Sequence, residues 1–317
     1  MIKINNLVAT YTTVRGTVTA VDKVNLEIPE GITLGIAGES GCGKTTLLKV
    51  LYGDIGFPLS IREGAVEYGM VGDQNEEITT QNIQKYWFRR IAYVPQGSMS
   101  SLNPVVRIRA QFLDYMRSGS GQKRMLEEAR EYVKSLGLPP EVLDAYPHQL
   151  SGGMRQRVMV AMASFIKPDI ILADEPTTAL DVVVQKGILL LLMELQEKMK
   201  STIFFVSHDM GVHYQIAQKM FIMYAAKGVE YGNAEDVFGN PLHPYTRLLI
   251  DSLPAVGDTN LRKGVSGHPP SLWDTLMGCR FTDRCPYATE ECRTHEPPLR
   301  EVQPGHFAAC HFSERFL

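Results

Sequence analysis

The sequence predicts an α/β fold whose core sheet is mostly parallel. Three observations predict this class. The apolar run 32–37 leads through a glycine-rich loop, residues 38–46, into an apolar helical stretch, which gives the order strand, loop, helix. Residues 170–173 and 202–206 are apolar without interruption, as expected of parallel strands that helices cover on both faces.

Residues 1 to about 31 predict strands that precede this core. Apolar and polar residues alternate from 18 to 28, which is typical of a strand with one buried face, and residues 29–31 predict a turn. Tyr11 lies just before this strand. The pattern alone predicts a half-buried tyrosine there.

The glycine-rich loop carries the first chemical signal. It reads Gly38-Glu39-Ser40-Gly41-Cys42-Gly43-Lys44-Thr45-Thr46 and fits the phosphate-binding pattern G-x-x-x-x-G-K-[ST]. Glycines let the backbone approach an anion closely, and a helix N-terminus offers N–H groups and a favourable dipole. Lys44 supplies a charge for the outer phosphates and Thr45 a hydroxyl for Mg²⁺, while Cys42 contributes its backbone N–H. The loop predicts a nucleotide-binding protein.

The middle of the chain predicts two short strands and then an insertion of helices. The strands are expected at residues 65–68 and 91–94, with a surface insert at 72–85 between them. From 105 to 165 the pattern is mainly helical, and residues 122–136 place their apolar side chains on one helix face.

Charged residues follow both uninterrupted apolar runs. Asp174 and Glu175 come after residues 170–173, and His208 comes after residues 202–206. The carboxyl ends of parallel strands border the ligand crevice, so these side chains are expected beside the loop. There Asp174 suits Mg²⁺, Glu175 suits an attacking water, and His208 suits the terminal phosphate.

A second anion-binding helix start is predicted at residues 150–157, Leu-Ser-Gly-Gly-Met-Arg-Gln-Arg. The serine and two glycines form a cap that leaves helix N–H groups free for an anion. Because one ATP needs only one phosphate loop, this second site suggests that two chains share each nucleotide.

Length and composition narrow the class. The 317 residues suffice for one large α/β domain and a smaller appendage, and no internal repeat indicates a second nucleotide domain. The net charge of −3 argues against nucleic acid as the main partner. No apolar run approaches the ~18–20 residues that span a bilayer, and the N-terminus resembles no signal peptide. We therefore expect a cytosolic protein that reaches a membrane only through partners.

Beyond residue 240 the composition shifts to Pro, His, Arg and Cys, which indicates the appendage. Four of the five cysteines lie there, with the spacing C-x5-C-x6-C-x17-C: Cys279, Cys285, Cys292 and Cys310. In a cytosolic chain this crowding favours a metal site over disulfides. Four thiolates suit either an iron–sulfur cluster or tetrahedral zinc.

Six motifs, in this order, resemble the ATPase subunit of an ATP-binding cassette (ABC) transporter. Residues 38–46 match Walker A, Gln96 the Q-loop, 150–156 the signature, 170–175 Walker B, 179–181 the D-loop and His208 the switch histidine. The resemblance implies a P-loop NTPase domain over residues 1–240, with an N-terminal antiparallel β subdomain and a helical insertion at about 98–165.

The resemblance also implies roles. Family cassettes pair head to tail, with ATP between Walker A of one chain and the signature of the other. Glu175 and His208 would be catalytic, with Glu175 the general base or water-orienting group. Magnesium would be served by Asp174, Gln96 and Thr45, and the adenine would lie on Tyr11. Further nucleotide contacts are implied for the whole loop 38–46 and for Ser151, Gly152, Gly153, Gln156, Asp174 and Asp181.

The residues beyond 240 point to one group within this family. Residues 240–249, with their His-Pro-Tyr-Thr segment, resemble the region that follows the cassette in importers of the dipeptide, oligopeptide and nickel group. The resemblance implies a C-terminal region over 241–317 and, as in some members, a [4Fe–4S] cluster on Cys279, Cys285, Cys292 and Cys310. We rank the cluster first, zinc second and disulfides third, because tight C-x2–4-C pairs are absent.

The function expected from this resemblance is ATP hydrolysis that powers import of a small solute: a di- or oligopeptide first, an oligosaccharide or nickel otherwise. The implied partners are two permease subunits, a second homologous ATPase subunit in a heterodimer, and an extracellular solute-binding protein, with the chain on the cytoplasmic face of the membrane. The alternative is an ABC ATPase of nucleic-acid repair or translation. Such chains carry coiled coils or two cassettes, which this sequence lacks.

Overall fold

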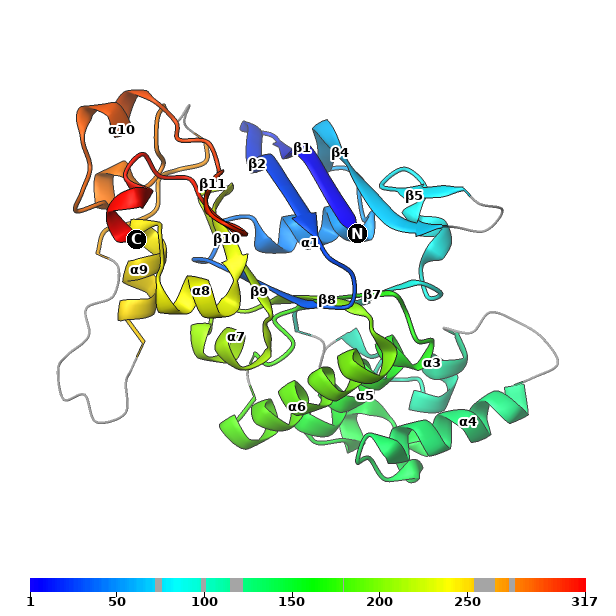
Figure 1. Ribbon diagram of the computed structural model, residues 1–317. Helices are drawn as coiled ribbons and strands as arrows, with labels where there is room; N and C mark the ends of the chain where they lie inside the picture. The colour runs from blue at the N-terminus through cyan, green and yellow to red at the C-terminus, as the bar shows by residue number, and fades with distance from the viewer. Residues whose placement is uncertain (72–75, 98–100, 115–121, 179, 254–265, 274–276) are drawn as a thin grey trace.

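The computed structural model describes residues 1–71, 76–97, 101–114, 122–178, 180–253, 266–273 and 277–317 (Figure 1). Two sheets enclose helix α1, and further helices cover the far face of the larger sheet (Figure 1). The strands are β1 Ile2–Thr13, β2 Gly16–Ile28, β3 Thr33–Ala37, β4 Leu59–Val71, β5 Glu77–Thr79, β6 Ile91–Val94, β7 Ile170–Asp174, β8 Thr202–Val206, β9 Lys219–Tyr224, β10 Lys227–Asn233, β11 Arg300–Gln303 and β12 His306–Ala308. The α-helices are α1 Lys44–Tyr52, α3 Ile108–Asp114, α4 Gln122–Ser135, α5 Gly152–Phe165, α6 Val182–Met199, α7 Met210–Ile216, α8 Ala234–Gly239, α9 Pro244–Asp251 and α10 Glu290–Thr294.

The larger sheet has eight strands in the order β11-β12-β10-β9-β3-β8-β7-β6. The strands β9, β3, β8, β7 and β6 pair in parallel, so the predicted mostly parallel core is confirmed. Both uninterrupted apolar runs form central strands, β7 and β8, and every residue of these two strands is buried. Parallel pairing brings the carboxyl ends of β6, β7 and β8 to one edge of the sheet.

The smaller sheet is antiparallel, in the order β2-β1-β4-β5, and packs on α1. This confirms the expected N-terminal antiparallel β subdomain. The predicted surface insert at 72–85 is wrong over its described part. Strand β5 pairs with β4, and Ile78 and Ile83 are fully buried. Burial of these two side chains makes the segment part of the subdomain core.

Helix α1 is enclosed by the two sheets (Figure 1). Leu47, Leu48 and Leu51 are fully buried in one apolar cluster with side chains from both sheets, among them Ile4, Val66 and Leu172. Fully burying a leucine side chain stabilises the folded state by about 1.5–3 kcal/mol. The helix that starts at the glycine-rich loop is therefore fixed from both sides.

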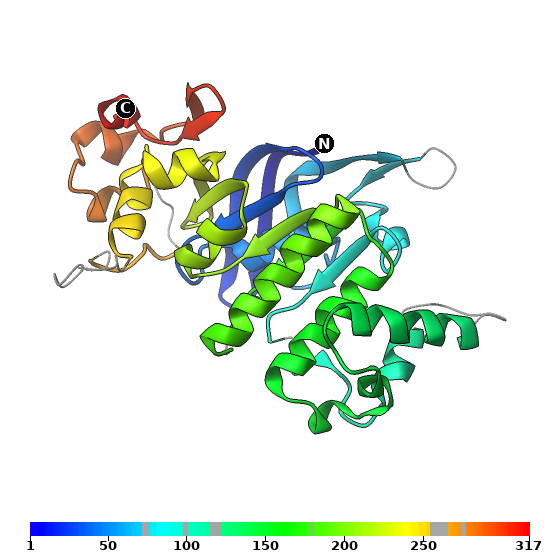
Figure 2. The same ribbon diagram turned by 60° about the horizontal axis from the view of Figure 1, so that its bottom comes forward.

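Helices α5, α6 and α7 cover the other face of the larger sheet, and α3 and α4 pack on α5. The expected helix at 122–136 is α4, whose Ala129 and Val133 are buried. Figures 1 and 2 show α3 and α4 (teal) at the opposite end of the molecule from the C-terminal elements (orange to red). Within the described residues no helix has the length and hydropathy needed to cross a membrane.

The C-terminal hairpin β11–β12 continues the larger sheet, because β12 pairs with β10. A buried carboxylate fixes this junction. Glu230 of β10 accepts hydrogen bonds from the backbone N–H groups of Leu242 (2.8 Å) and His243 (2.9 Å) and lies 2.8 Å from Nε2 of His306. Glu230 is fully buried, so these three partners replace the hydrogen bonds that an exposed carboxylate makes with water.

Replacement of Leu48 by alanine is expected to lower the free energy of unfolding by about 2–5 kcal/mol, because α1 cannot move to fill the cavity between two sheets. The control is Leu190→Ala on α6, where the leucine is 55% exposed and a change within about 0.5 kcal/mol is expected. Urea unfolding followed by circular dichroism measures both. Equal losses would contradict the packing described here.

Candidate functional site

The glycine-rich loop joins β3 to α1 and requires its glycines. Gly38 and Gly43 have φ angles of 150° and 107°, a region that favours glycine. A Cβ atom would lie 2.1 Å from the carbonyl oxygen of Met223 at Gly38, and 2.0 Å from that of Ala20 at Gly43. Gly43 is the N-cap of α1, and no side chain caps the helix there, so its first N–H groups are left for an anion.

Lys44 lies across this loop. Its Nζ donates hydrogen bonds to the carbonyl oxygens of Gly38 (2.7 Å) and Glu39 (2.9 Å). The Cys42 thiol is buried beneath it, and burial raises the pKa of that thiol. The N–H of Cys42, expected to face a phosphate, donates to the Glu39 carbonyl oxygen at 3.2 Å. The loop is therefore held in its curled form by bonds within itself.

Asp174, at the end of β7, contacts the start of α1. Its carboxylate accepts hydrogen bonds from the Thr45 hydroxyl (3.2 Å) and the Tyr93 hydroxyl (3.0 Å). Burial raises the pKa of Asp174, and burial together with the Asp174 charge raises the pKa of Tyr93, so the tyrosine remains a donor. Thr45, Gln96 and Asp174 were expected to serve one Mg²⁺. The structure brings the oxygens of Thr45 and Asp174 together, whereas the Gln96 amide donates to Glu175 instead.

Gln96, Glu175 and His208 also converge, each just beyond one of the strands β6, β7 and β8. The Glu175 carboxylate accepts hydrogen bonds from the Gln96 amide (3.2 Å) and the Thr178 hydroxyl (2.9 Å). Its Oε2 lies 3.7 Å from Nδ1 of His208. Glu175 adopts a left-handed backbone, with φ 47°, and its N–H donates to the Val206 carbonyl oxygen at 3.0 Å. A left-handed backbone is strained for a glutamate, and such strain is typical of functional sites.

Tyr11 reaches the same helix from the smaller sheet. Its hydroxyl accepts a hydrogen bond of 3.4 Å from the Thr46 hydroxyl, and its ring is half-buried beside the loop. The ring also packs against the apolar cluster around α1, and the adenine contact expected of Tyr11 stays a prediction.

The second predicted anion site lies elsewhere on the chain. Ser151 is the N-cap of α5, where its hydroxyl accepts a 3.3 Å hydrogen bond from the N–H of Met154, and Gly152 and Gly153 open the helix. Gln156, one turn further, is buried. Because α1 and α5 lie on opposite faces of the larger sheet (Figure 1), this site and the phosphate loop face different surroundings.

Asp181 is the N-cap of α6. Its carboxylate accepts hydrogen bonds from the N–H groups of Val183 (3.0 Å) and Val184 (2.9 Å). Val182 and Val183 are about four-fifths exposed, at 79% and 82%. Ala179, the first residue of the expected D-loop, lies outside the described residues.

The structure gathers the four tail cysteines around one small cavity, which all four line. Each is a free thiol. Burial raises the pKa of Cys279 and Cys285 and raises that of Cys310 to about 11, and the charges of neighbouring cysteines add to each increase. Within the described part of the chain, no three His, Cys, Asp or Glu side chains are arranged to hold a metal ion.

Two contacts of the site had no sequence-based prediction. Tyr93 carries the only hydroxyl of the otherwise apolar strand β6. That polar group is the one feature of the sequence that could have indicated its contact with Asp174. Thr178 lies three residues after Glu175, close enough for a turn to return its hydroxyl to the carboxylate. Both depend on the backbone conformation at the sheet edge.

Comparison with known proteins gives two family matches. The ABC transporter family matches residues 21–178, and the C-terminal region of oligopeptide and dipeptide transporters matches residues 229–292. The dipeptide transport ATP-binding protein DppD of Caldanaerobacter subterraneus subsp. tengcongensis is 38% identical over 319 residues, covering 99% of this chain and 97% of that protein. The oligopeptide transport ATP-binding protein OppD of Escherichia coli K12 is 38% identical over 98% of this chain and 92% of its own.

Solved structures agree with these matches. A dimeric structure of MJ0796, a bacterial ABC transporter cassette, aligns with a TM-score of 0.62 and 29% identity over 74% of this chain and 99% of its own. The same cassette, as a dimer in a post-hydrolysis state with ADP and phosphate, aligns equally well.

Replacement of Gly38 by alanine is expected to weaken ATP binding at least about tenfold, because the added Cβ meets the Met223 carbonyl oxygen and the φ of 150° is strained for alanine. Gly56→Ala is the control, since a Cβ there meets nothing within 4 Å. Titration with a fluorescent ATP analogue measures both variants. Equal affinities would contradict the required close approach at Gly38.

Proposed function

The chain belongs to the ATP-binding proteins of dipeptide and oligopeptide ABC transporters, and on this premise we propose that it hydrolyses ATP to power import of a di- or oligopeptide through a membrane permease. The observation that carries the proposal is the convergence of Gln96, Glu175 and His208 at the sheet edge beside the phosphate loop. Three side chains from three strands meet where a terminal phosphate and its attacking water would lie.

In the proposed mechanism the loop N–H groups and Lys44 hold the phosphates, and Thr45 and Asp174 would hold Mg²⁺. The metal ion, when bound, neutralises charge that develops on the phosphate oxygens. Glu175 orients the attacking water, and Gln96 and Thr178 hold its carboxylate. His208 is 66% exposed at the side chain and free to turn toward the terminal phosphate. Tyr11 supports the adenine ring.

We further propose that two cassettes share each nucleotide, with Ser151, Gly152 and Gly153 of a second chain closing the site. The support is that this helix start lies on α5, away from the chain's own phosphate loop. The start of α6 lies beside it, because a Cβ at Gly153 would meet the Val184 side chain at 2.6 Å, and Val182 and Val183 are exposed there. A homologous ATPase subunit is the proposed partner, in a heterodimer.

The permease is proposed to dock on the helical part at the cytoplasmic face of the membrane. A cavity of about 190 Å³ opens there and is lined by Leu102, Asn103, Val106, Gln111, Met159 and Met162, among others. Gln111 is a buried residue of this lining and forms hydrogen bonds with the backbone of Asn103 and Val106. Val105, beside it, is 79% exposed. Its lining is half apolar and half polar, with Ser101 and Asp114 among the polar residues. Such a cavity beside an exposed valine suits a short amphipathic helix of a permease, which would receive solute from a binding protein.

For the four tail cysteines we propose a [4Fe–4S] cluster, with zinc as the second choice. The donor chemistry fits, since four thiols line one cavity. Among the described residues the thiols are not close enough together to form a ready ligand set, so binding requires their sulfur atoms to move closer. A cluster would act as a covalent clip for a segment with a small core of its own.

Glu175→Gln is expected to keep ATP binding and to lose turnover by about 10²-fold or more, because the amide cannot take or direct a proton of the water. Glu128→Gln on α4, whose glutamate pairs with Arg124 at the surface, is the matched control and keeps the parental rate. Phosphate release from the assembled transporter measures turnover. A parental rate in Glu175→Gln would overturn the proposed role.

Anaerobically purified protein is expected to contain iron and acid-labile sulfide in equal amounts and to absorb in the thiolate-to-iron region. Cys285→Ser is expected to lower the iron content sharply, whereas Cys42→Ala, outside the tail, leaves it unchanged. A colourless protein with stoichiometric zinc would reject the cluster in favour of the second choice.

A further inference from the structure

A short segment of the tail carries two arginines that bind the nucleotide domain. Arg284, next to Cys285, forms a bidentate pair with Glu39 of the phosphate loop: Nη1 to Oε2 and Nη2 to Oε1, each at 2.8 Å. The Arg284 side chain is only 5% exposed, so water screens this pair weakly. Two parallel N–H···O bonds fix direction as well as distance.

Tyr224 of β9 and two tail residues, Phe281 and Tyr245, support this pair. The Tyr224 hydroxyl accepts a 3.1 Å hydrogen bond from Arg284, and the guanidinium carbon lies 5.6 Å from the Tyr224 ring centroid and 5.8 Å from that of Phe281. Tyr245, from the His-Pro-Tyr-Thr segment, accepts a 2.8 Å hydrogen bond from the backbone N–H of Glu39. Glu39 is therefore held at its side chain and at its backbone by residues outside the loop.

Glu39 in turn sets the inside of the loop. Its carbonyl oxygen accepts the hydrogen bonds of both the Lys44 ammonium and the Cys42 N–H. A shift of the Glu39 backbone therefore moves the charge that meets the phosphates and opens the curl of the loop.

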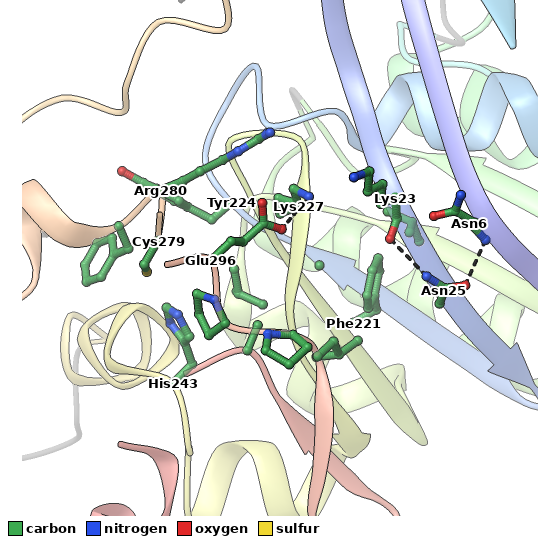
Figure 3. A pocket seen from close by; sticks show the side chains of 18 residues that line it. Asn6, Lys23, Asn25, Phe221, Tyr224, Lys227, His243, Cys279, Arg280 and Glu296 are labelled. Atoms are coloured by element: carbon green, nitrogen blue, oxygen red, sulfur yellow. Dashed lines mark hydrogen bonds and ion pairs between the residues drawn. The ribbon is translucent and has the colours of Figure 1, made fainter. Parts of the chain in front are cut away.

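The same segment holds the other side of the site through Arg280, next to Cys279. Arg280 bonds the Asp22 carboxylate and the Ala225 carbonyl oxygen. Asp22 lies two residues after Ala20 in β2. The carbonyl oxygen of Ala20 packs against Gly43 of the phosphate loop. Figure 3 shows Arg280 and Cys279 side by side at a cavity of about 290 Å³.

We infer that Arg284 is a positioning residue of the nucleotide site: through Glu39 it holds the phosphate loop in its binding form, so that the tail forms part of the frame for ATP. This inference rests on the proposed function. We expect loss of Arg284 to change the affinity for ATP more than the rate of turnover, because Arg284 acts on the loop before chemistry begins.

The test compares Arg284→Gln, Glu39→Gln, the double variant and Arg284→Lys in the full-length chain, by titration with a fluorescent ATP analogue and Mg²⁺. Arg284→Gln is expected to weaken ATP binding about tenfold, because loss of a hydrogen bond between charged groups typically changes an equilibrium constant by about that factor. Arg284→Lys recovers part of the loss, because it keeps the charge without the fork. The matched control is Arg293→Gln, whose arginine is 55% exposed in a surface pair with Asp283 and whose loss changes affinity less than about twofold.

The double variant discriminates between mechanisms. If Arg284 acts through Glu39, the double variant binds no more weakly than either single variant; additive losses would reject the inference. In the assembled transporter the KM for ATP rises in Arg284→Gln while kcat stays within about twofold. Parental affinity in Arg284→Gln also rejects the inference, whereas a parental chain that binds no ATP rejects the proposed function instead. If Arg284→Gln does not fold, as judged by its thermal unfolding, Glu39→Gln tests the pair from the loop side.

Discussion

Parallel pairing of the central strands is the constraint on which the site depends. Because β6, β7 and β8 run in one direction, their carboxyl ends open at the same edge, and residues up to 112 positions apart in sequence meet there. Gln96, Glu175 and His208 share no local element, and no shorter connection would bring them together. Glu175 itself departs from the extended backbone of β7, with a left-handed φ of 47° directly after the strand ends.

Helix α1 extends this constraint to the phosphates. It is buried between the two sheets, and Thr45 and Asp174 connect its first turn to the end of β7. The loop before it can therefore curl tightly while its helix stays fixed. Rigid support on both sides, with open N–H groups at one end, is the arrangement that anion recognition requires.

The sequence predicted what depends on local patterns: the class of fold, the strands β7 and β8, the phosphate loop and the residues that line the sheet edge. It did not predict contacts that arise from tertiary packing. Burial of Ile78 follows from β5 pairing with β4, and Tyr93 reaches Asp174 only across two paired strands. The bond between Arg284 and Glu39 joins residues 245 positions apart, and no periodicity encodes it. The spacing of the tail cysteines predicted that they lie together, but it did not decide which metal group they would bind.

Glu230 shows how the end of the chain is tied to its middle. The carboxylate belongs to β10, yet one of its three partners, His306, comes 76 residues later. All the strands of the parallel core precede His306 in the chain, so the residue that completes the burial of this carboxylate comes after the whole core in sequence. Without His306 and β12, the Glu230 carboxylate would lie at the open edge of the sheet and keep only its two backbone partners, Leu242 and His243.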